Sequence, residues 1–437
     1  MRLPKYATYK EWSGHETSIP THWEVSRIKN LASINDDTLP EDSDPSLEIE
    51  YVDIGSVSLD RGIHQTQSCT FSEAPSRARR LVRVGDIIVS TVRTYLKAIA
   101  PIDEEQCHLV VSTGFAVVRA GSRLSSGFGR YALQSPGFVD EVISRSTGVS
   151  YPAINASDLA RIEIPVPPAE EQVAITAFLD REIAKIDVLI VEQERLLALL
   201  SERRQAIIYK AVSQGLSPAV PRKDSGLPWL KEVPEHWEIK RLKAISPFVS
   251  VGIVVNPSAY VSDDGLPYIY GGDISEGYID TGRCRRISPE ASSAQAKTQI
   301  RKGDLLTVRV GAPGVTAVVP EDCEGGNCAS VMLIRGGDFD SEWLCHAMNS
   351  RMVRYQVEVV QYGAAQEQFN IGHAVNFVIP TPPVQEQSDI ANHIRSEVGG
   401  IDRLSDNCKR AISLLSERRS ALISSVVTGQ FDVRGVA

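Results

Sequence analysis

The stretch LLSERRQAII occupies residues 199–208, and it returns as LLSERRSALI at residues 414–423 with eight of the ten positions identical. The interval between the two copies is close to half of the 437-residue chain. Solenoid and propeller repeats have much shorter periods, from about 20 to 50 residues. The chain is therefore expected to consist of one large unit made twice.

Two further landmarks recur at nearly the same interval. PTHWEVSRIK at residues 20–29 reappears as PEHWEIKRLK at residues 234–243, and IPVPPAEEQ at residues 164–172 reappears as IPTPPVQEQ at residues 379–387. The three intervals agree to within a single position, which excludes a chance match of one helix-forming string. Each copy is long enough to fold around its own core.

Composition and charge restrict the class of protein. Apolar residues make up 42% and charged residues 23% of the chain, as in ordinary soluble proteins. No apolar run reaches the ~18 residues needed to cross a bilayer, and the start MRLPKYATYKEW lacks a signal-peptide core, so we expect a cytoplasmic protein without membrane contact. The net charge of −9 argues against general polyanion binding and leaves local patches for any nucleic acid.

The seven cysteines are odd in number, scattered and not repeated between the halves, so we expect no disulfide framework. The conceivable zinc ligands are Cys323, Cys328, Cys345 and His346. They include no Cys-x-x-Cys pair and have no counterpart in the other half, so no metal site is expected.

Each half begins with a segment of mixed pattern. LVRVGDIIVSTVR (residues 81–93) and QIRKGDLLTVRVG (residues 299–311) carry a Gly-Asp turn signal between β-branched stretches, which indicates a hairpin-like start of a strand. FAVVR (residues 115–119) and VMLIR (residues 331–335) are further strand-like runs, each followed by a helix-compatible stretch. This pattern predicts an α+β domain in each half.

After the Pro-Pro pairs at 167–168 and 382–383, apolar residues follow alternating spacings of three and four. The first stripe contains Leu179, Ile183, Ile186, Ile190, Leu197, Leu200 and Ile207, with Gln193 and Arg204 at the remaining seam positions. The second contains Ile394, Val398, Ile401, Ser405, Cys408, Ile412, Leu415, Arg419 and Leu422. A helix of about 40 residues spans roughly 60 Å and needs a partner for its stripe. We expect the two helices to form an antiparallel coiled coil with pseudo-two-fold symmetry; the alternative is that each stripe packs on its own domain.

The chain carries no motif of a familiar catalytic class. Adenine methyltransferases use an Asn/Asp-Pro-Pro-aromatic loop, whereas VPPA and TPPV lack both the polar residue before the prolines and the aromatic residue after them. A GxxxxGK[ST] phosphate loop, HExxH and GxSxG do not occur. His22 and His236 recur, but each sits beside a Trp at an expected domain edge, where packing or capping is favoured over catalysis. A duplicated protein without duplicated chemistry is expected to be a binder.

Basic residues gather at roughly matching places in both halves. The candidates for phosphate contact are Arg77, Arg79, Arg80, Arg83, Arg93, Tyr95 and Lys97 in the first half and Arg283, Arg285, Arg286, Lys297, Arg301, Lys302 and Arg309 in the second. Each alone reads as a solvated surface residue, and their recurrence favours phosphate tracking. A second surface is STGVSYPAIN (residues 146–155), which aligns with QYGAAQEQFN (residues 361–370) at its ends and differs in the middle. Tyr151, Gln366 and Gln368 are the side chains there that could reach base edges.

The order of Pro-x-His-Trp-Glu, a divergent segment, Pro-Pro-x-x-Glu-Gln and a Leu-x-x-Arg-Arg helix, present twice, resembles the DNA-specificity subunits of type I restriction-modification enzymes. The resemblance implies that two target-recognition domains each read one half of a bipartite double-stranded DNA site, while paired helices set the spacer. It implies a first recognition domain at residues 1–168, a central long helix at 169–215, a second recognition domain at 216–383 and a C-terminal long helix at 384–437.

The resemblance also implies that this chain is not an enzyme and binds no cofactor itself. Two adenine methyltransferase subunits, which bind S-adenosylmethionine, would dock on the repeated regions, and restriction subunits that use ATP and Mg²⁺ would join them. The repeated arginines Arg203, Arg204, Arg418 and Arg419 would then dock a partner subunit or pair with the neighbouring Glu202 and Glu417. Two alternatives stay open: a specificity module of a modification-only or phage-defence system, and a coiled-coil scaffold joining two protein-binding domains without DNA.

Overall fold

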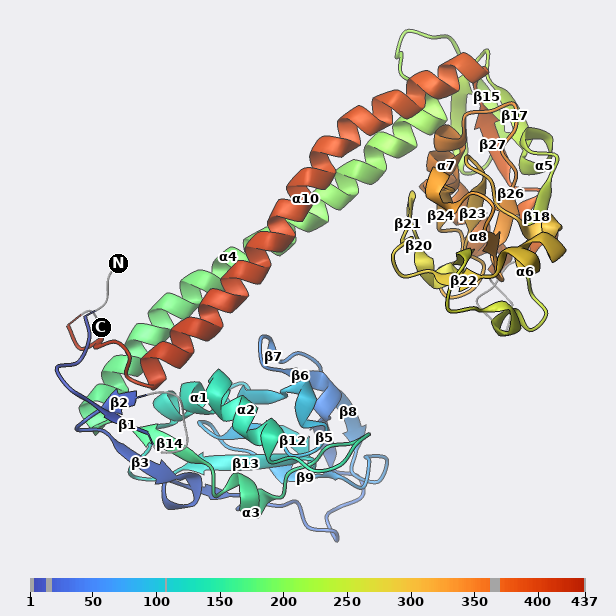
Figure 1. The fold of residues 1–437 in the computed structure, drawn as a ribbon. Helices are drawn as coiled ribbons and strands as arrows, with labels where there is room; N and C mark the ends of the chain where they lie inside the picture. The colour runs from blue at the N-terminus through green and yellow to red at the C-terminus, as the bar shows by residue number, and fades with distance from the viewer. Residues whose placement is uncertain (1–3, 13–17, 107, 362–369, 436–437) are drawn as a thin grey trace. The chain divides into compact units, whose positions relative to one another are not determined.

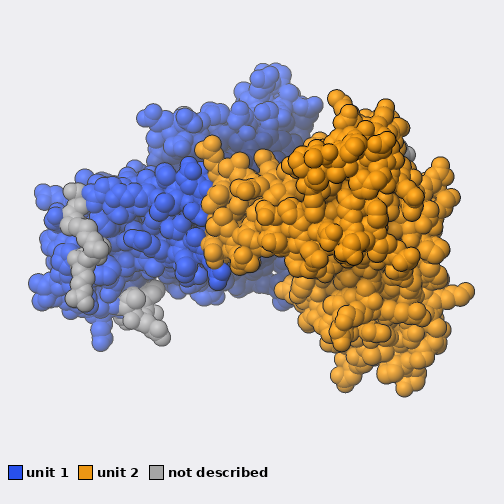
Figure 2. Space-filling model, turned by 90° about the horizontal axis from the view of Figure 1, so that it is seen from above, with its two compact units in different colours: residues 1–194, 409–437 blue, residues 195–408 orange. Residues whose placement is uncertain are grey.

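The computed structural model describes residues 4–12, 18–106, 108–361 and 370–435, and it mixes helices and strands as the α+β prediction requires (Figure 1). The chain divides into two compact units (Figure 2). Unit 1 comprises residues 1–194 and 409–437, and unit 2 comprises residues 195–408. Each unit therefore contains one mixed segment together with part of each long helix.

Two four-stranded sheets form the centre of unit 1 in its described part, with the strand orders β11-β10-β13-β4 and β8-β5-β12-β9. The first sheet consists of β4 (Ala32–Ile34), β10 (Ile87–Ser90), β11 (Ile99–Pro101) and β13 (Phe115–Ala120). The second consists of β5 (Glu48–Val52), β8 (Gln67–Thr70), β9 (Ala78–Leu81) and β12 (Val110–Ser112). Neighbours are antiparallel except β5 and β12, which are parallel.

Unit 2 repeats this topology with the strand orders β24-β23-β26-β18 and β22-β19-β25. Its strands are β18 (Val249–Val251), β19 (Leu266–Ile269), β22 (Arg285–Ile287), β23 (Leu305–Thr307), β24 (Thr316–Val318), β25 (Asn327–Cys328) and β26 (Met332–Ile334). The parallel pair of unit 2, β19 with β25, is equivalent to the parallel pair β5 with β12 of unit 1. At the place of β9, the described chain has an isolated bridge between Gln299 and Asn327.

Short strand pairs and helices complete each unit in matching order. Unit 1 has β1 (Tyr9–Glu11) with β2 (Ser18–Pro20), β3 (Glu24–Arg27) with β14 (Glu163–Val166), β6 (Val57–Ser58) with β7 (Gly62–Ile63), and helices α1 (Ser126–Gln134), α2 (Pro136–Ser144) and α3 (Ala156–Leu159). Unit 2 has β15 (Arg222–Leu227) with β16 (Leu230–Pro234), β17 (Glu238–Arg241) with β27 (Val378–Thr381), β20 (Ile274–Ser275) with β21 (Tyr278–Ile279), and helices α5 (Leu242–Ile245), α6 (Pro289–Ala294), α7 (Ser341–Asn349), α8 (Arg351–Gln361) and α9 (Ile371–Ala374).

A buried ion pair recurs beside the first sheet of each unit. Arg119 Nη2 lies 2.7 Å from Asp86 Oδ2 in unit 1, and Arg335 Nη1 lies 2.6 Å from Asp304 Oδ2 in unit 2. Both aspartates are almost fully buried. An unpaired buried charge is strongly destabilising. Arg119 therefore compensates the buried charge of Asp86 in unit 1, and Arg335 compensates that of Asp304 in unit 2.

The Gly-Asp signals mark the starts of β10 and β23, but they do not close a hairpin. Gly85 and Gly303 have φ of 85° and 84°, in the left-handed region that glycine adopts at little cost. In unit 1 the stretch before the turn forms β9, which belongs to a different sheet from β10. The expected hairpin is thus wrong for unit 1, because the turn passes the chain from one sheet to another.

The long helices are α4 (Ala169–Gln214) and α10 (Val384–Val427), and both start directly after a Pro-Pro pair. Gln172 Nε2 donates to the carbonyl of the first proline of its pair at 2.9 Å, and its Oε1 accepts from the backbone N–H of Ser125, the N-cap of α1. Gln387 makes the same two bonds to its own proline and to Asp340, the N-cap of α7. The repeated glutamine therefore ties each long helix to the first helix of its unit.

In each unit a segment of α4 packs against a segment of α10. The first turns of α4 share an apolar cluster with the last turns of α10 in unit 1, and the last turns of α4 share one with the first turns of α10 in unit 2. The same clusters contain residues of the mixed segments, such as Phe128 in unit 1 and Trp343 in unit 2. The stripes thus face both the other helix and the domain core. No helix among the described residues is long and apolar enough to cross a membrane.

Two ion pairs between α4 and α10 join equivalent residues of the two copies of the repeat. Arg419 Nε lies 3.1 Å from Asp187 Oδ1 in unit 1, and Arg204 Nε lies 3.2 Å from Asp402 Oδ1 in unit 2. Asp187 and Asp402 are separated by the repeat interval, as are Arg204 and Arg419. The duplication has therefore preserved this contact, with aspartate and arginine on opposite helices in both units.

Candidate nucleic-acid interface

The connection between β10 and β11 in unit 1 has an unusual backbone. Arg93 and Lys97 have φ of 51° and 52° and flank a 3-10 turn at Thr94–Leu96. Residues with side chains rarely adopt this left-handed conformation, and such strained positions cluster at functional sites. The connection is therefore a candidate binding element.

The predicted second surface, residues 146–155, lies against this connection. Thr94 Oγ1 donates to Ser146 Oγ at 2.8 Å, and the Arg93 guanidinium lies 5.0 Å from the centre of the Tyr151 ring. Tyr95 and Tyr151 are 52% and 66% exposed. The structure thus joins residues from the two predicted surfaces into one exposed group of basic and aromatic side chains.

The other predicted arginines of unit 1 lie on or next to β9. Arg77 is exposed, and its carbonyl accepts from the backbone N–H of Thr113. Arg79 stacks 4.6 Å from the centre of the Phe71 ring, and Arg80 Nη1 donates to Thr38 Oγ1 at 3.3 Å. The Thr113 turn also reaches the connection after β10, because Gly114 O accepts from Thr91 N at 2.8 Å. The backbone at Arg77 is therefore linked to the exposed connection through the Thr113–Gly114 turn.

Arg83 is engaged by a carboxylate. Its Nη2 lies 2.8 Å from Asp37 Oδ2, which also accepts from Arg119. Hydrogen bonding and charge from Arg119, and then from Arg83, lower the pKa of Asp37. Arg83 is thus already paired with a carboxylate of the same chain, and it is a weaker candidate for contact with an external anion.

Unit 2 has a cavity of about 480 Å³ at the corresponding ends of β19, β23 and β25. Three of the predicted arginines line it: Arg283, Arg285 and Arg309. Arg309 lies in the connection between β23 and β24, which corresponds to the connection between β10 and β11 in unit 1. Both units therefore place an arginine in the same connection of the topology.

An aromatic ring also supports an arginine in this cavity. The Arg285 guanidinium lies 4.2 Å from the centre of the Tyr270 ring. Arg283 is exposed and lies 3.7 Å from Asp280 Oδ2. Arg286 lies on the same strand, where its backbone pairs with Pro267, and its side chain does not line the cavity. The alternation of side chains along β22 thus separates Arg286 from Arg285.

The remaining predicted base-reading side chains, Gln366 and Gln368, lie outside the described residues. The segment that follows them is described: Asn370 Oδ1 accepts from the backbone N–H of His373 at 3.1 Å and caps α9. In unit 1 the corresponding Asn155 precedes α3. Both predicted variable loops therefore lead into a short helix.

The four candidate docking arginines fall into two kinds. Arg203 and Arg418 are exposed, whereas Arg204 and Arg419 are half-buried and pair with aspartates of the other long helix. The structure assigns these two ion pairs to Asp402 and Asp187, rather than to the neighbouring glutamates. Arg203 and Arg418 occupy equivalent exposed positions in the two copies of the repeat.

Tyr270 and Glu276 are prominent in unit 2 and were not among the sequence candidates. Tyr270 supports Arg285, and Glu276 accepts hydrogen bonds from Arg204, Gln205 and Arg354. Residues 51–63 align with residues 268–279, and tyrosine, glycine and serine recur at equivalent positions. This recurrence could have marked the region in the sequence. The two residues themselves differ between the copies.

This arrangement suits the binding of an anion. A guanidinium resting on an aromatic face keeps its fork of donors available for phosphate oxygens or base edges. His22 and His236 lie 2.7 Å from Glu171 and Glu386 at the starts of the long helices. Each histidine thus contacts a glutamate in the first turn of a long helix.

Comparison with known proteins identifies the relatives of this arrangement. Residues 20–196 match the profile of the family described as the type I restriction modification DNA specificity domain. The EcoBI specificity subunit of a type I restriction enzyme, from Escherichia coli, is 24% identical over 309 residues; the match spans 68% of this chain and 64% of that protein, less than two thirds of its length. A putative type I restriction enzyme MjaX specificity subunit from Methanocaldococcus jannaschii is 21% identical over 452 residues, or 98% of each chain.

A solved structure supports the likeness at the level of the fold. A chain from work on complex assembly and conformational transition of the type I R-M system aligns with a TM-score of 0.67 and 22% identity. The alignment covers 94% of this chain and 98% of that chain.

Proposed function

This chain belongs to the type I restriction modification DNA specificity family, and on that premise we propose that it selects the DNA target of a complex whose other subunits carry out the chemistry. In this proposal the chain binds double-stranded DNA and has no catalytic activity of its own. Each unit reads one half of a bipartite sequence.

One observation carries this proposal more than any other. The two units share their strand order, yet equivalent connections bear different side chains: Arg93, Tyr95 and Lys97 follow β10, whereas Arg309 follows β23. Phosphate contacts position a protein on DNA, and side chains that reach base edges specify the sequence. A common framework with unlike exposed side chains therefore suits the reading of two different half-sites.

The helices provide the second part of the proposal. In it, α4 and α10 form an antiparallel coiled coil with pseudo-two-fold symmetry and set the spacer between the half-sites. Two adenine methyltransferase subunits dock on the repeated regions, with Arg203 and Arg418 as equivalent exposed contacts. Restriction subunits complete the assembly. S-adenosylmethionine, ATP and Mg²⁺ belong to these partners.

The acidic net charge of −9 fits such an assembly. Non-specific affinity for DNA depends on the number of phosphates that a protein neutralises. If partner subunits supply most of these contacts, the isolated chain needs only local basic surfaces. It should then bind its site weakly alone and tightly in the methyltransferase complex.

The decisive experiment sequences modified bases in the genome with the gene intact and disrupted. We expect a bipartite motif with methylated adenines that disappears on disruption. Exchange of residues 216–383 for the equivalent segment of a relative should change one half of the motif and leave the other half unchanged. A motif that survives disruption would refute the proposal, and failure to co-purify with a methyltransferase subunit would favour a scaffold.

A further inference from the structure

The hairpin β20–β21 connects the arginine cavity of unit 2 to the long helices. It follows directly after the turn Gly271–Asp273, which lines the cavity. Ile274 and Ile279 are buried on the hairpin, and Glu276 and Gly277 form its turn. A shift of the hairpin would therefore move one wall of the cavity.

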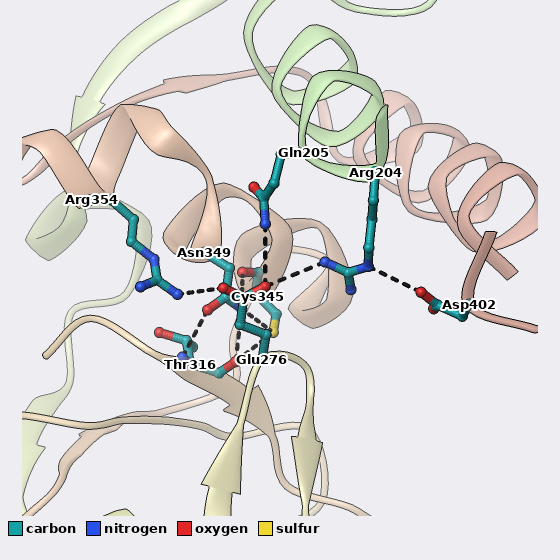
Figure 3. Close-up of polar contacts among 8 residues, drawn as sticks. All are labelled: Arg204, Gln205, Glu276, Thr316, Cys345, Asn349, Arg354 and Asp402. Carbon is teal, nitrogen blue, oxygen red and sulfur yellow. Dashed lines mark hydrogen bonds and ion pairs between the residues drawn. The ribbon is translucent and has the colours of Figure 1, made fainter. Parts of the chain in front are cut away.

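The backbone of this turn is held by buried groups. Gly277 N donates to Thr316 O at 2.9 Å, and the same carbonyl accepts from Asn349 Nδ2 at 2.7 Å. Thr316 N donates in return to Asn349 Oδ1 (Figure 3). Asn349 and Thr316 are both buried. The hairpin can thus stay folded without any contribution from the Glu276 side chain.

The Glu276 carboxylate reaches two helices at once (Figure 3). Its Oε2 accepts from Arg204 Nη1 at 3.3 Å and from Gln205 Nε2 at 3.4 Å, both on α4. Its Oε1 accepts from Arg354 Nη2 on α8 at 2.5 Å. Arg204 continues to Asp402 on α10. A chain of polar contacts therefore runs from the hairpin to both long helices within unit 2.

Unit 1 holds its equivalent hairpin in another way. Leu59 occupies the position of Glu276, directly after the first strand, and packs against the apolar cluster that contains the long-helix residues of unit 1. The nearest polar counterpart is Arg61, 3.5 Å from Glu194 on α4, with side chains 71% and 48% exposed. Such an exposed pair contributes little. Polar clamping of the hairpin is thus a feature of unit 2.

We propose that Glu276 is a positioning residue for DNA reading, which fixes the arginine cavity of unit 2 against α4 and so sets the spacer length at which the second half-site is accepted. The inference rests on the proposed function. A carboxylate that accepts on both oxygens from two helices restricts the hairpin in more than one direction. Without this clamp, the hairpin stays bonded to Thr316 but loses its polar link to α4.

The test uses the full chain in complex with its methyltransferase subunits. Methylation is measured on duplexes that carry both half-sites with the natural spacer or with one base pair added or removed. Glu276→Gln should lower the preference for the natural spacer by about fivefold or more, as expected for loss of a coupling between two elements, without changing the bases selected. Glu276→Asp keeps the charge and should restore part of the preference.

Arg61→Gln is the matched control in unit 1 and should keep the spacer preference. An unchanged preference in Glu276→Gln would overturn the inference. An equal loss of activity on all spacers, or an altered base preference, would also overturn it, because either result indicates a general structural role. A wild-type complex without any bipartite preference would instead refute the proposed function.

Discussion

The starts of the two long helices carry the same glutamate in different surroundings. In unit 1, Glu171 Oε2 accepts from Trp23 Nε1 at 2.9 Å and from Tyr6 Oη at 3.0 Å. Its Oε1 lies 2.7 Å from His22 Nε2 and 3.5 Å from Arg434 Nη1. Burial, and then the charge of Glu171, raise the pKa of Tyr6, so its hydroxyl stays protonated and donates. Both oxygens of the Glu171 carboxylate therefore have polar partners.

In unit 2 the corresponding Glu386 lies 2.7 Å from His236 Nε2. Trp237 Nε1 is buried and has no hydrogen-bond partner among the described residues. Tyr6 and Arg434 supply two of the contacts of Glu171, whereas Gly215 lies against Trp237 and Glu386 in unit 2. Duplication has kept the position of the glutamate, and local neighbours decide how much stability it provides.

The largest expected contrast between the units lies at equivalent positions of α1 and α7. Tyr131 donates to Asp180 at 2.6 Å in unit 1, whereas unit 2 has His346 there, close to Arg204 and Arg395. Burial, and then the two arginines, lower the pKa of His346 to about 4. The unfolded chain takes up this proton near pH 6.5, so unit 2 should lose at most about 3 kcal/mol as the pH falls from about 6.5 to about 4.

Hydrogen exchange at pH values between 7 and 4.5, corrected for intrinsic rates, measures this loss separately in each unit. His346→Tyr introduces the residue of unit 1, whose phenol stays neutral throughout this range, so the part of the acid loss that is specific to unit 2 should disappear. The protection of unit 1 in the same samples is the internal control. Equal acid sensitivity in the variant and the wild type would show that other groups dominate.

A smaller contrast is expected from replacing the two helix-start glutamates. Glu171→Gln turns one acceptor into a donor that faces Trp23, Tyr6 or His22, and it should cost about 2 kcal/mol of unfolding free energy. Glu386 is more exposed, with 27% of its side chain accessible against 7% for Glu171. Glu386→Gln keeps an acceptor for His236 and should cost less than about 1 kcal/mol. Urea unfolding of both variants measures the two losses of unfolding free energy. A larger loss in Glu386→Gln than in Glu171→Gln would contradict the prediction.

The duplicated framework could be predicted because its signals are local. Proline chemistry and a change of period place the helix starts, and the repeated Glu-Gln pair lies in the first turns of α4 and α10. The Gly-Asp signal shows the limit of prediction from local sequence patterns. It marks the start of β10, but the pairing of β10 with β13 depends on contacts between residues about 30 positions apart, which no local pattern encodes.

The candidate interface could be predicted in its residues and not in its geometry. Arg93 and Tyr151 were separate candidates, and their contact depends on how residues 146–154 fold back on the connection after β10. Recurrence between the two halves does not single out Tyr270 and Glu276, because the equivalent positions in unit 1 hold Asp53 and Leu59. A residue that serves one copy alone leaves no repeated signal.

The smallest expected contrast concerns the ion pairs between α4 and α10. Asp187 and Asp402 are 49% and 54% exposed, so each pair should contribute less than about 1 kcal/mol. When Asp402 is replaced, Arg204 retains Glu276 at 3.3 Å, whereas Arg419 loses the partner that lies on the other long helix. Asp187→Asn should therefore destabilise the chain by roughly 0.5 kcal/mol more than Asp402→Asn at low salt. Thermal unfolding at low salt and in 1 M salt tests this, since salt screens exposed pairs and should reduce the difference. Equal destabilisation at low salt would mean that Glu276 does not compensate Arg204.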